Sequence, residues 1–323
     1  MNMPTEEWLK QRQTGIGGSD VAAILGLSPW RSPVDVFLDK TGQTPALDAN
    51  EAMYWGTVLE DVVAKHYANL SGTTIQRITK MMRHPKHDWM IGNIDRAIVT
   101  PGSRARFDDG KLMGADGILE CKTASAYKAG DWGNPFDDDA IPTQYVAQAM
   151  WYLGIAGLEW CDIAVLIGGQ KYLVKRVVRD EETIAGMIAK AEEFWVKHVL
   201  ANVAPEPKSG EDALKLFPRD TGRSIEANPK TLELLARARE LKEQIAALEI
   251  ELEGDRKKGI NGVMGELKAW MADASAISIE NEPLATWKAQ TSQRFDATAF
   301  KAEHPDLYAK FIKPSETRVF RLK

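Results

Sequence analysis

The sequence predicts an α/β (α+β) fold in which a β-sheet is flanked by helices. Apolar residues recur with helical periodicity near 53–70 and 142–156. Between these segments lie stretches typical of strands, near 74–82, 90–99 and 117–123. Helices that enclose a run of strands indicate a layered domain with one sheet.

Further elements are expected on either side of this centre. A short helix over 5–13, with Thr5 as its N-cap, precedes the turn Gly17-Gly18-Ser19-Asp20, which opens a helix through about residue 25. A strand pair near 161–167 and 172–178 is followed by a helix from about 180 to 200.

A loop-rich stretch from Pro205 to Pro218 separates two regions of different composition. We therefore expect a core domain over 1–205 and a C-terminal extension over 206–323. In the extension, a heptad-like spacing predicts a long helix near 229–253, carried by Leu234, Leu241, Ile245, Leu248 and Leu252. The other expected elements are a second helix at 260–273 that completes a helical hairpin, strands at 276–280, 284–288 and 317–322, and a small helix near 297–311.

Composition excludes several classes of protein. With 27% charged residues, 44% hydrophobic residues and a net charge of −5, the chain of 323 residues is no cationic coat for DNA. Nucleic-acid binding would require basic residues concentrated in a groove. Two cysteines without a CxxC motif, and no signal-like N-terminus, predict a reducing cytoplasm. The longest apolar run, near 150–167, contains Glu159 and Asp162, so no membrane span is expected.

The most informative stretch is Glu120-Cys121-Lys122, at the end of a predicted strand. Because side chains alternate along a strand, Glu120 and Lys122 point to the same face. A carboxylate and an ammonium so placed can bind a divalent cation and a water molecule together. A salt bridge on the surface of a sheet is the alternative explanation.

Asp95 ends the segment Met90–Asp95 and precedes the Glu120 strand along the chain. If the two strands are antiparallel neighbours, the carboxylates of Asp95 and Glu120 can share one Mg²⁺, which prefers oxygen ligands. Such a metal polarises a phosphate and lowers the pKa of its water, which Lys122 could orient or help to deprotonate. Asp116 is a rival ligand, but its Ala-Asp-Gly context is typical of a hairpin turn, and we prefer Asp95.

Three other polar residues lie on predicted helices. Glu60 flanks an apolar stripe and by itself resembles a solvated surface residue. Gln144 and Gln148 share one face of a mostly apolar helix, where each side-chain amide needs a partner. That partner is either neighbouring backbone or a polar active site.

Arg12 and Ser19 form a second candidate constellation. Ser19 is well placed to cap the helix that follows it. Free backbone amides in this glycine-rich turn, together with Arg12, would also suit an anion.

The ordered motifs resemble those of the YqaJ-type viral recombinases, relatives of λ exonuclease in the PD-(D/E)XK nuclease superfamily. The resemblance covers about residues 5–200 and rests on Arg12 with Gly17-Gly18-Ser19-Asp20, Ser28-Pro29-Trp30, Trp55-Gly56 with Leu59-Glu60, Gly92-Asn93-Ile94-Asp95, Gly117–Thr123 and Tyr145–Gln148. It implies a restriction-endonuclease-like core with a mixed central sheet flanked by helices. The chain has Ile94-Asp95 where the superfamily name has Pro-Asp, which leaves the aspartate intact.

The resemblance also implies a Mg²⁺-dependent 5′→3′ exonuclease that acts on double-stranded DNA and leaves 3′ single-stranded tails. Mn²⁺ can substitute for Mg²⁺ in such a site. The implied metal ligands are Asp95, Glu120, the backbone carbonyl of Cys121 and, as an additional ligand, Glu60; Lys122 and Gln148 complete the catalytic set, and Arg12 and Ser19 bind the 5′-phosphate of the DNA end.

The implied partners are double-stranded DNA ends and a phage-type single-strand annealing protein, in the cytoplasm of a bacterial host of a phage or prophage. The family's ring-shaped trimers imply a homo-oligomer. Two other readings stay open, another DNA endonuclease or repair nuclease of the superfamily and a DNA-end-binding assembly protein without catalysis. The intact set of Asp95, Glu120 and Lys122 favours an enzyme.

Overall fold

The computed structural model describes residues 6–44, 51–108, 111–134, 137, 140–314 and 316–322. The chain forms two compact units, Met1–Phe217 and Pro218–Lys323. The predicted boundary at 205/206 precedes α7 (Gly210–Leu216), which belongs to the first unit. Two contacts hold α7 to the first unit: Lys215 binds Asp35 at 2.7 Å and Ser32 donates to Asp212 at 2.6 Å.

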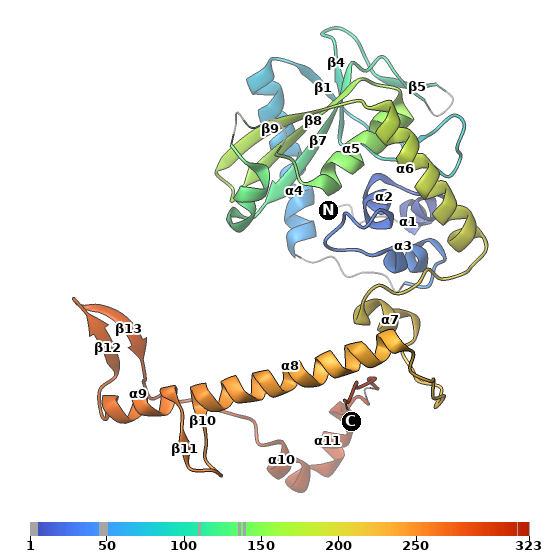
Figure 1. Cartoon of the computed structure of the whole chain (residues 1–323). Coiled ribbons are helices and arrows are strands. Elements are labelled where there is room, and N and C mark those ends of the chain that lie inside the picture. The colour runs from blue at the N-terminus through green and yellow to red at the C-terminus, as the bar shows by residue number, and fades with distance from the viewer. Residues whose placement is uncertain are drawn as a thin grey trace. The chain divides into compact units, whose positions relative to one another are not determined.

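A five-stranded mixed sheet lies at the centre of the first unit, in the order β1-β4-β7-β8-β9 (Figure 1). Its strands are β1 (Thr74–Arg77), β4 (Arg96–Val99), β7 (Gly117–Ala124), β8 (Trp160–Ile167) and β9 (Lys171–Val178). Only β7 and β8 pair in parallel; the other neighbours are antiparallel. The predicted α/β fold with a central sheet is confirmed.

Helices cover both faces of this sheet. On one face, α4 (Glu51–Ser71) packs Val63, Ala64 and Tyr67 against Leu119 of β7. On the other, α5 (Thr143–Ala156) is almost wholly buried in the main core. Because side chains alternate along β7, Leu119 faces α4 and Glu120 faces the α5 side.

The remaining helices of the first unit are α1 (Glu6–Gln13), α2 (Gly18–Ile24), α3 (Pro33–Lys40) and α6 (Glu181–Phe194), which continues as a π-helical turn over Trp195–Leu200. Of these helices, α2 and α6 pack on α5, and α1 and α3 lie beside them. A 3₁₀ helix, Ala126–Trp132, follows β7. Two small hairpins complete the unit, β2 (Met82–Arg83) with β3 (Ile91–Gly92) and β5 (Arg106–Asp108) with β6 (Lys111–Met113).

The second unit begins with the long helix α8 (Pro229–Glu253), whose bounds match the prediction. Asn228 caps it by accepting the Thr231 N–H at 2.9 Å, and a proline occupies its first turn. Its other elements are β10 (Gly254–Asp255), β11 (Ile260–Asn261), α9 (Val263–Met271), β12 (Ala276–Ile279), β13 (Glu282–Thr286), α10 (Ala297–Glu303) and α11 (Pro305–Phe311).

Several predicted elements differ from the structure. The strand expected over 90–99 is broken between β3 and β4, so Asp95 precedes a strand instead of ending one. The helix expected near 297–311 divides at His304, because the residue before a proline disfavours helical geometry. The strand expected at 317–322 is absent from the described residues there. The predicted cap Thr5 lies outside the described residues.

None of the helices in the described part of the chain is both long enough and apolar enough to cross a membrane.

Candidate active site

Asp95 and Glu120 meet where β4 begins, beside the middle of β7. The antiparallel register pairs Arg96 with Leu119, which brings the preceding Asp95 opposite Glu120. The backbone N–H of Asp95 donates to Glu120 Oε1 at 3.3 Å, and the N–H of Cys121 donates to Asp95 Oδ2 at 2.8 Å. The two carboxylates are therefore held together by backbone contacts.

Lys122 lies on the same face of β7 as Glu120. Its Nζ is 2.9 Å from Glu120 Oε2, and it lies 5.4 Å from the centre of the Tyr145 ring on α5. Burial acts to lower the pKa of Lys122, but the charges of Glu120 and Asp95 raise it above its usual range. Lys122 is therefore an ammonium donor in this arrangement.

The pKa of Asp95 is raised by its surroundings. Burial raises its pKa, and the neighbouring charge of Glu120 raises it further, to about 7. Glu120 is buried and Asp95 is half-buried, so two carboxylates this close repel each other, and a divalent cation between them would remove the repulsion. The pair therefore fits an ion such as Mg²⁺, which binds one or two protein carboxylates and keeps several waters.

Glu60 lies near this pair, but its carboxylate is bound elsewhere. Arg96 binds Glu60 Oε1 at 2.6 Å and also donates to the backbone carbonyl of Asp95 at 2.6 Å. The negative charge of Glu60 still contributes to the raised pKa of Asp95. Among the described residues, no group of three or more His, Cys, Asp or Glu side chains is arranged to hold a metal ion. In this structure the site consists of two carboxylates with Glu60 beside them.

The polar face of α5 completes the site. Gln148 Nε2 donates to the hydroxyl of Tyr152 at 3.0 Å. Tyr152 is buried, and burial, followed by the charge of Glu120, raises its pKa above the usual range. The Gln148 amide therefore has a side-chain partner, Tyr152, instead of a backbone one, and that partner lies close enough to Glu120 to be affected by its charge.

Arg12 and Ser19 lie together next to a buried ionic cluster. Arg12 Nη2 is 3.4 Å from Ser19 Oγ and 3.6 Å from Asp20 Oδ1. Asp20 is fully buried; its Oδ1 binds Arg31 at 2.7 Å and its Oδ2 binds Lys40 at 2.7 Å. Burial acts to raise the pKa of Asp20, but the charges of Lys40, Arg12 and Arg31 hold it well below its usual range.

This cluster places two guanidinium groups at the surface. Lys40 and Asp20 are both buried and neutralise each other, whereas the side chains of Arg12 and Arg31 are 29% and 27% exposed. Asp39 pairs with Arg31 at 3.2 Å and is also partly exposed. Arg12 and Arg31 both approach Asp20 Oδ1, and two guanidinium groups that lie this close together suit a single phosphate group. Because α2 has only seven residues, a helix dipole adds little to this site.

Gly18 connects the Arg12–Ser19 pair with the carboxylate site. A Cβ at this position would lie 2.8 Å from a ring carbon of Tyr152 and 2.9 Å from Cγ of Gln148. Only glycine permits this close packing of α2 on α5. Ser19 is the next residue of α2 after this close approach to α5.

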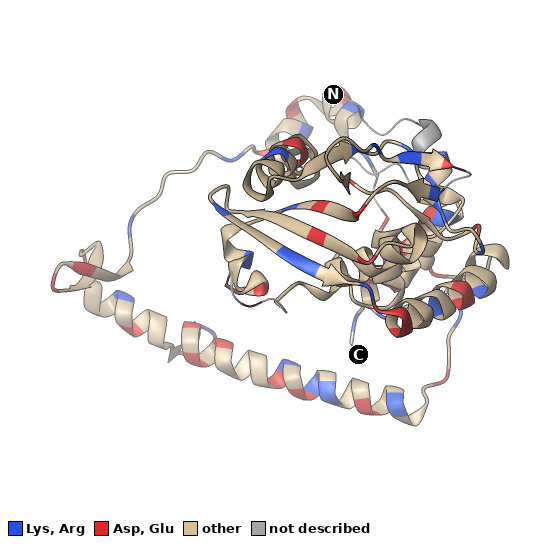
Figure 2. Cartoon of the chain, turned by 90° about the horizontal axis from the view of Figure 1, so that it is seen from above, with Lys and Arg blue, Asp and Glu red and all other residues tan. Residues whose placement is uncertain are grey.

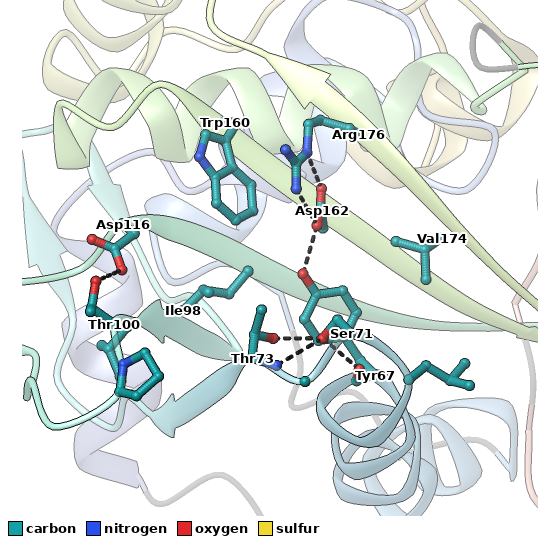
Figure 3. A pocket seen from close by; sticks show the side chains of 14 residues that line it. Tyr67, Ser71, Thr73, Ile98, Thr100, Asp116, Trp160, Asp162, Val174 and Arg176 are labelled. Carbon is teal, nitrogen blue, oxygen red and sulfur yellow. Dashed lines mark hydrogen bonds and ion pairs between the residues drawn. The ribbon is translucent and has the colours of Figure 1, made fainter.

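Asp116, the rival metal ligand, lies in a different place. It accepts a hydrogen bond from Thr100 Oγ1 at 2.8 Å and lines a pocket of about 620 Å³ (Figure 3). In the same pocket, Asp162 accepts the hydroxyl of Tyr67 at 2.7 Å and pairs with Arg176 at 2.7 Å. Of the two candidate aspartates, the structure brings Asp95 to Glu120.

Sequence reasoning missed Tyr152, Arg31 and Lys40. Tyr152 follows Gln148 by four residues, so helical spacing alone could have placed both on one face. No local signal indicates that Lys40 is buried against Asp20, because the two residues belong to different helices.

Comparison with known proteins identifies the family. Residues 7–159 match the YqaJ-like viral recombinase domain. The chain is 39% identical over 332 residues to the protein YqaJ of Bacillus subtilis (strain 168), which covers 99% of this chain and 95% of the relative. The chain belongs to the YqaJ family of viral recombinases. A protein of Acanthamoeba polyphaga mimivirus is 22% identical over 158 residues, 49% of this chain and 28% of that protein.

Two solved structures show weaker likeness. The alkaline exonuclease LHK-Exo from Laribacter hongkongensis has a TM-score of 0.46 and 19% identity, covering 62% of this chain and 94% of that one. A phage-related exonuclease from Haemophilus somnus 129PT has a TM-score of 0.40 and 14% identity, covering 58% and 96%.

Proposed function

We propose that this YqaJ-family protein is a Mg²⁺-dependent 5′→3′ exonuclease on linear double-stranded DNA. It would leave 3′ single-stranded tails for phage-type recombination by single-strand annealing. The observation that carries this proposal is the convergence of Asp95, Glu120 and Lys122, with Lys122 Nζ 2.9 Å from Glu120 Oε2. An acidic pair beside an ammonium group suits hydrolysis of a phosphodiester.

Asp95 and Glu120 would hold the metal, with the carbonyl of Cys121 and the Glu60 carboxylate as further ligands. When bound, Mg²⁺ or Mn²⁺ would polarise a phosphate oxygen and lower the pKa of a coordinated water. Glu60 can join only by leaving Arg96, to which it is bound at 2.6 Å.

Lys122 would orient the attacking water and stabilise developing negative charge through its ammonium group. Gln148 would position that water or the scissile phosphate from α5, where its amide is held by the Tyr152 hydroxyl at 3.0 Å. The Gln148 amide does not ionise and cannot act as a general acid or base, so its role would be to orient groups by hydrogen bonding.

Arg12 and Ser19 would bind the terminal 5′-phosphate. A guanidinium group and a hydroxyl that lie 3.4 Å apart can both donate charge-assisted hydrogen bonds to it. Gly18, next to Ser19, packs against Gln148 and Tyr152, and this supports the proposal that a phosphate bound there would lie near the helix that carries Gln148. This proximity would make cleavage start at an end.

The wider assignments follow from the same proposal. A homo-oligomer such as a ring-shaped trimer would let an acidic chain enclose DNA in a basic channel. The products would pass to a single-strand annealing protein in the bacterial cytoplasm. The exonuclease core would be the first unit, Met1–Phe217, and the extension would be the second unit, Pro218–Lys323.

A digestion assay on linear duplex DNA tests the proposal. Wild type should release nucleotides from 5′ ends with Mg²⁺ and not with EDTA, and strand-resolved products should show 3′ tails. Lys122→Ala should lower the rate at least about a hundredfold while DNA binding remains. Lys128→Ala is the matched control, because that lysine is 68% exposed and pairs with Asp131 on the same 3₁₀ helix.

Two results would reject the proposal. Cleavage of closed circular DNA at a rate similar to that of linear DNA would indicate an endonuclease. Near-normal Mg²⁺-dependent digestion by Lys122→Ala would remove this site from the reaction.

A further inference from the structure

The helix α8 (Pro229–Glu253) exposes an apolar stripe. None of its described residues is buried, although it is 25 residues long. The stripe consists of leucine and isoleucine side chains that are 40–64% exposed: Leu234, Leu241, Ile245, Leu248 and Leu252. Because a lone helix is marginally stable in water, a stripe of this size requires a partner.

The spacing of the stripe is that of a coiled coil. With Ala238 included, the apolar positions alternate between four and three residues apart, at 234, 238, 241, 245, 248 and 252. This is an unbroken a/d heptad pattern, with Leu at each d position. Such a pattern indicates that the partner is another helix.

The charges on α8 are segregated along its length. Before residue 240 the basic residues Lys230, Arg237 and Arg239 outnumber Glu233. From residue 240 onward, Lys242 is the sole basic residue among the acidic residues Glu240, Glu243, Glu249, Glu251 and Glu253. Figure 2 shows the blue bands concentrated toward one end of this helix and the red bands toward the other.

This segregation opposes the needs of the helix itself. Acidic residues stabilise the first turn of a helix and basic residues stabilise the last, but α8 has no acidic residue in its first turn and no basic residue in its last. The pattern is explained if the basic half of one helix faces the acidic half of another. Two copies of α8 satisfy this condition only when they run in opposite directions.

We propose that α8 pairs with α8 of a second copy of this chain as an antiparallel coiled coil. The register that uses the whole stripe places Ile245 of each copy opposite Leu241 of the other. Arg237 of each copy then faces Glu251 of the other, so a symmetrical pair contains two such ion pairs. The proposal depends on the second unit alone and is independent of the nuclease assignment.

Cysteine substitutions in the full chain test the pairing and its direction. In an antiparallel pair, position 241 faces position 245 of the other copy. Leu241→Cys and Ile245→Cys should therefore stay uncrosslinked as single variants under oxidation. The double variant should migrate at twice the chain mass of 35.9 kDa on a non-reducing gel. Wild type is the control, since Cys161 is buried and Cys121 is half-buried.

Charge reversal provides a second test by sedimentation equilibrium on the full chain. Arg237→Glu and Glu251→Arg should each weaken self-association by about two- to thirtyfold, because each disrupts two surface ion pairs. The double reversal should restore it. In a parallel pair, position 237 would face Lys242 of the other copy, so Arg237→Glu would strengthen association.

Either of two outcomes overturns the proposal. Efficient crosslinking of the single cysteine variants, with strengthening by Arg237→Glu, would show a parallel pair. A double cysteine variant that remains monomeric on the gel would show that the stripe is covered by something other than a second α8.

Discussion

Replacement of Asp20 by asparagine should destabilise the first unit severely. The change preserves the shape of the side chain and its contact with the backbone N–H of Gly17, 2.9 Å away. Among the described residues two carboxylates pair with Lys40, and the change removes the closer and fully buried one. Lys40 Nζ would keep the carbonyl of Arg12 at 2.8 Å, but its counter-ion would then be Asp39, which is 3.8 Å away and partly exposed.

The expected magnitude follows from burial. Both Asp20 and Lys40 have fully buried side chains. Removal of one member of a buried ion pair costs about 3–5 kcal/mol of unfolding free energy. For a unit of about this size each kcal/mol lowers the melting temperature by about 2–4 °C, so a decrease of about 6–20 °C is expected.

Urea unfolding, monitored through hydrogen exchange in peptides from α5, measures the unfolding free energy of the first unit separately from that of the second. Asp20→Asn should lose most of the stated free energy, and Asp20→Asn/Lys40→Met should recover much of it, because no unpaired charge is then buried. Asp131→Asn is the control, since that surface pair with Lys128 is 53% exposed at Asp131 and should contribute less than about 1 kcal/mol.

The contribution of Asp20 to the unfolding free energy should depend on pH. The folded-state pKa of Asp20 is held below its usual range. Its ionisation therefore contributes stability above about pH 4, and that contribution is lost as the pH falls through the folded pKa. The difference between wild type and Asp20→Asn should shrink in acid. A loss under about 1 kcal/mol at neutral pH, or a difference unchanged by acid, would refute the buried-pair reasoning.

Three further predictions concern the proposed site. Gly18→Ala should lower the unfolding free energy by about 1–3 kcal/mol and lower turnover, because a Cβ would lie 2.8 Å from a ring carbon of Tyr152 on α5. Gly186→Ala is the control in the same thermal-unfolding and turnover assays. It should be neutral or stabilising, because Gly186 lies on a helix with open space around it. Arg12→Ala should reduce the preference for 5′-phosphate over 5′-hydroxyl ends by about ten- to a hundredfold in digestion rate, and equal rates on both ends for wild type would exclude a phosphate pocket. Gln148→Ala should lower turnover with little change in melting temperature, whereas Gln144→Ala should keep its turnover; normal turnover in a destabilised Gln148→Ala would indicate a structural amide.

Elements with strong local signals could be predicted from the sequence. The bounds of α8 follow from the Asn228 cap, the proline at its first turn and Gly254 at its end. The short helices α3 and α7 were missed although Ser32 and Ser209 cap them, because the prolines around each of them indicate a loop. The strand expected at 317–322 was wrong because alternation alone, without a pairing strand, does not make a sheet.

Some residues of the candidate site could likewise be predicted from local spacing, and others could not. Glu120 and Lys122 are two residues apart on one strand, so the sequence places them on one face. Asp95 requires only that its strand and the Glu120 strand pair as antiparallel neighbours, as β4 and β7 do on either side of the β5–β6 hairpin. The contacts of Asp20 with Arg31 and Lys40 join separate helices, and the charge state of each depends on burial that no local spacing reveals.

The position of Gly18 gives a physical reason why the glycine-rich turn and the glutamine helix occur in one site. A phosphate at Arg12 and Ser19 can be useful to the carboxylate pair only if α2 approaches α5 closely, and the absent side chain at position 18 permits that approach. The buried Asp20–Lys40 pair then fixes the next turn of α2 to α3, so the approach is rigid. A variant that loosens the α2–α3 contact and a variant that pushes α2 away from α5 should therefore differ in turnover. Asp20→Asn/Lys40→Met, which keeps the packing at Gly18, should retain turnover better than Gly18→Ala at temperatures where both variants are folded. If the double variant is the slower enzyme under those conditions, the ionic cluster contributes to the reaction beyond holding α2 in place.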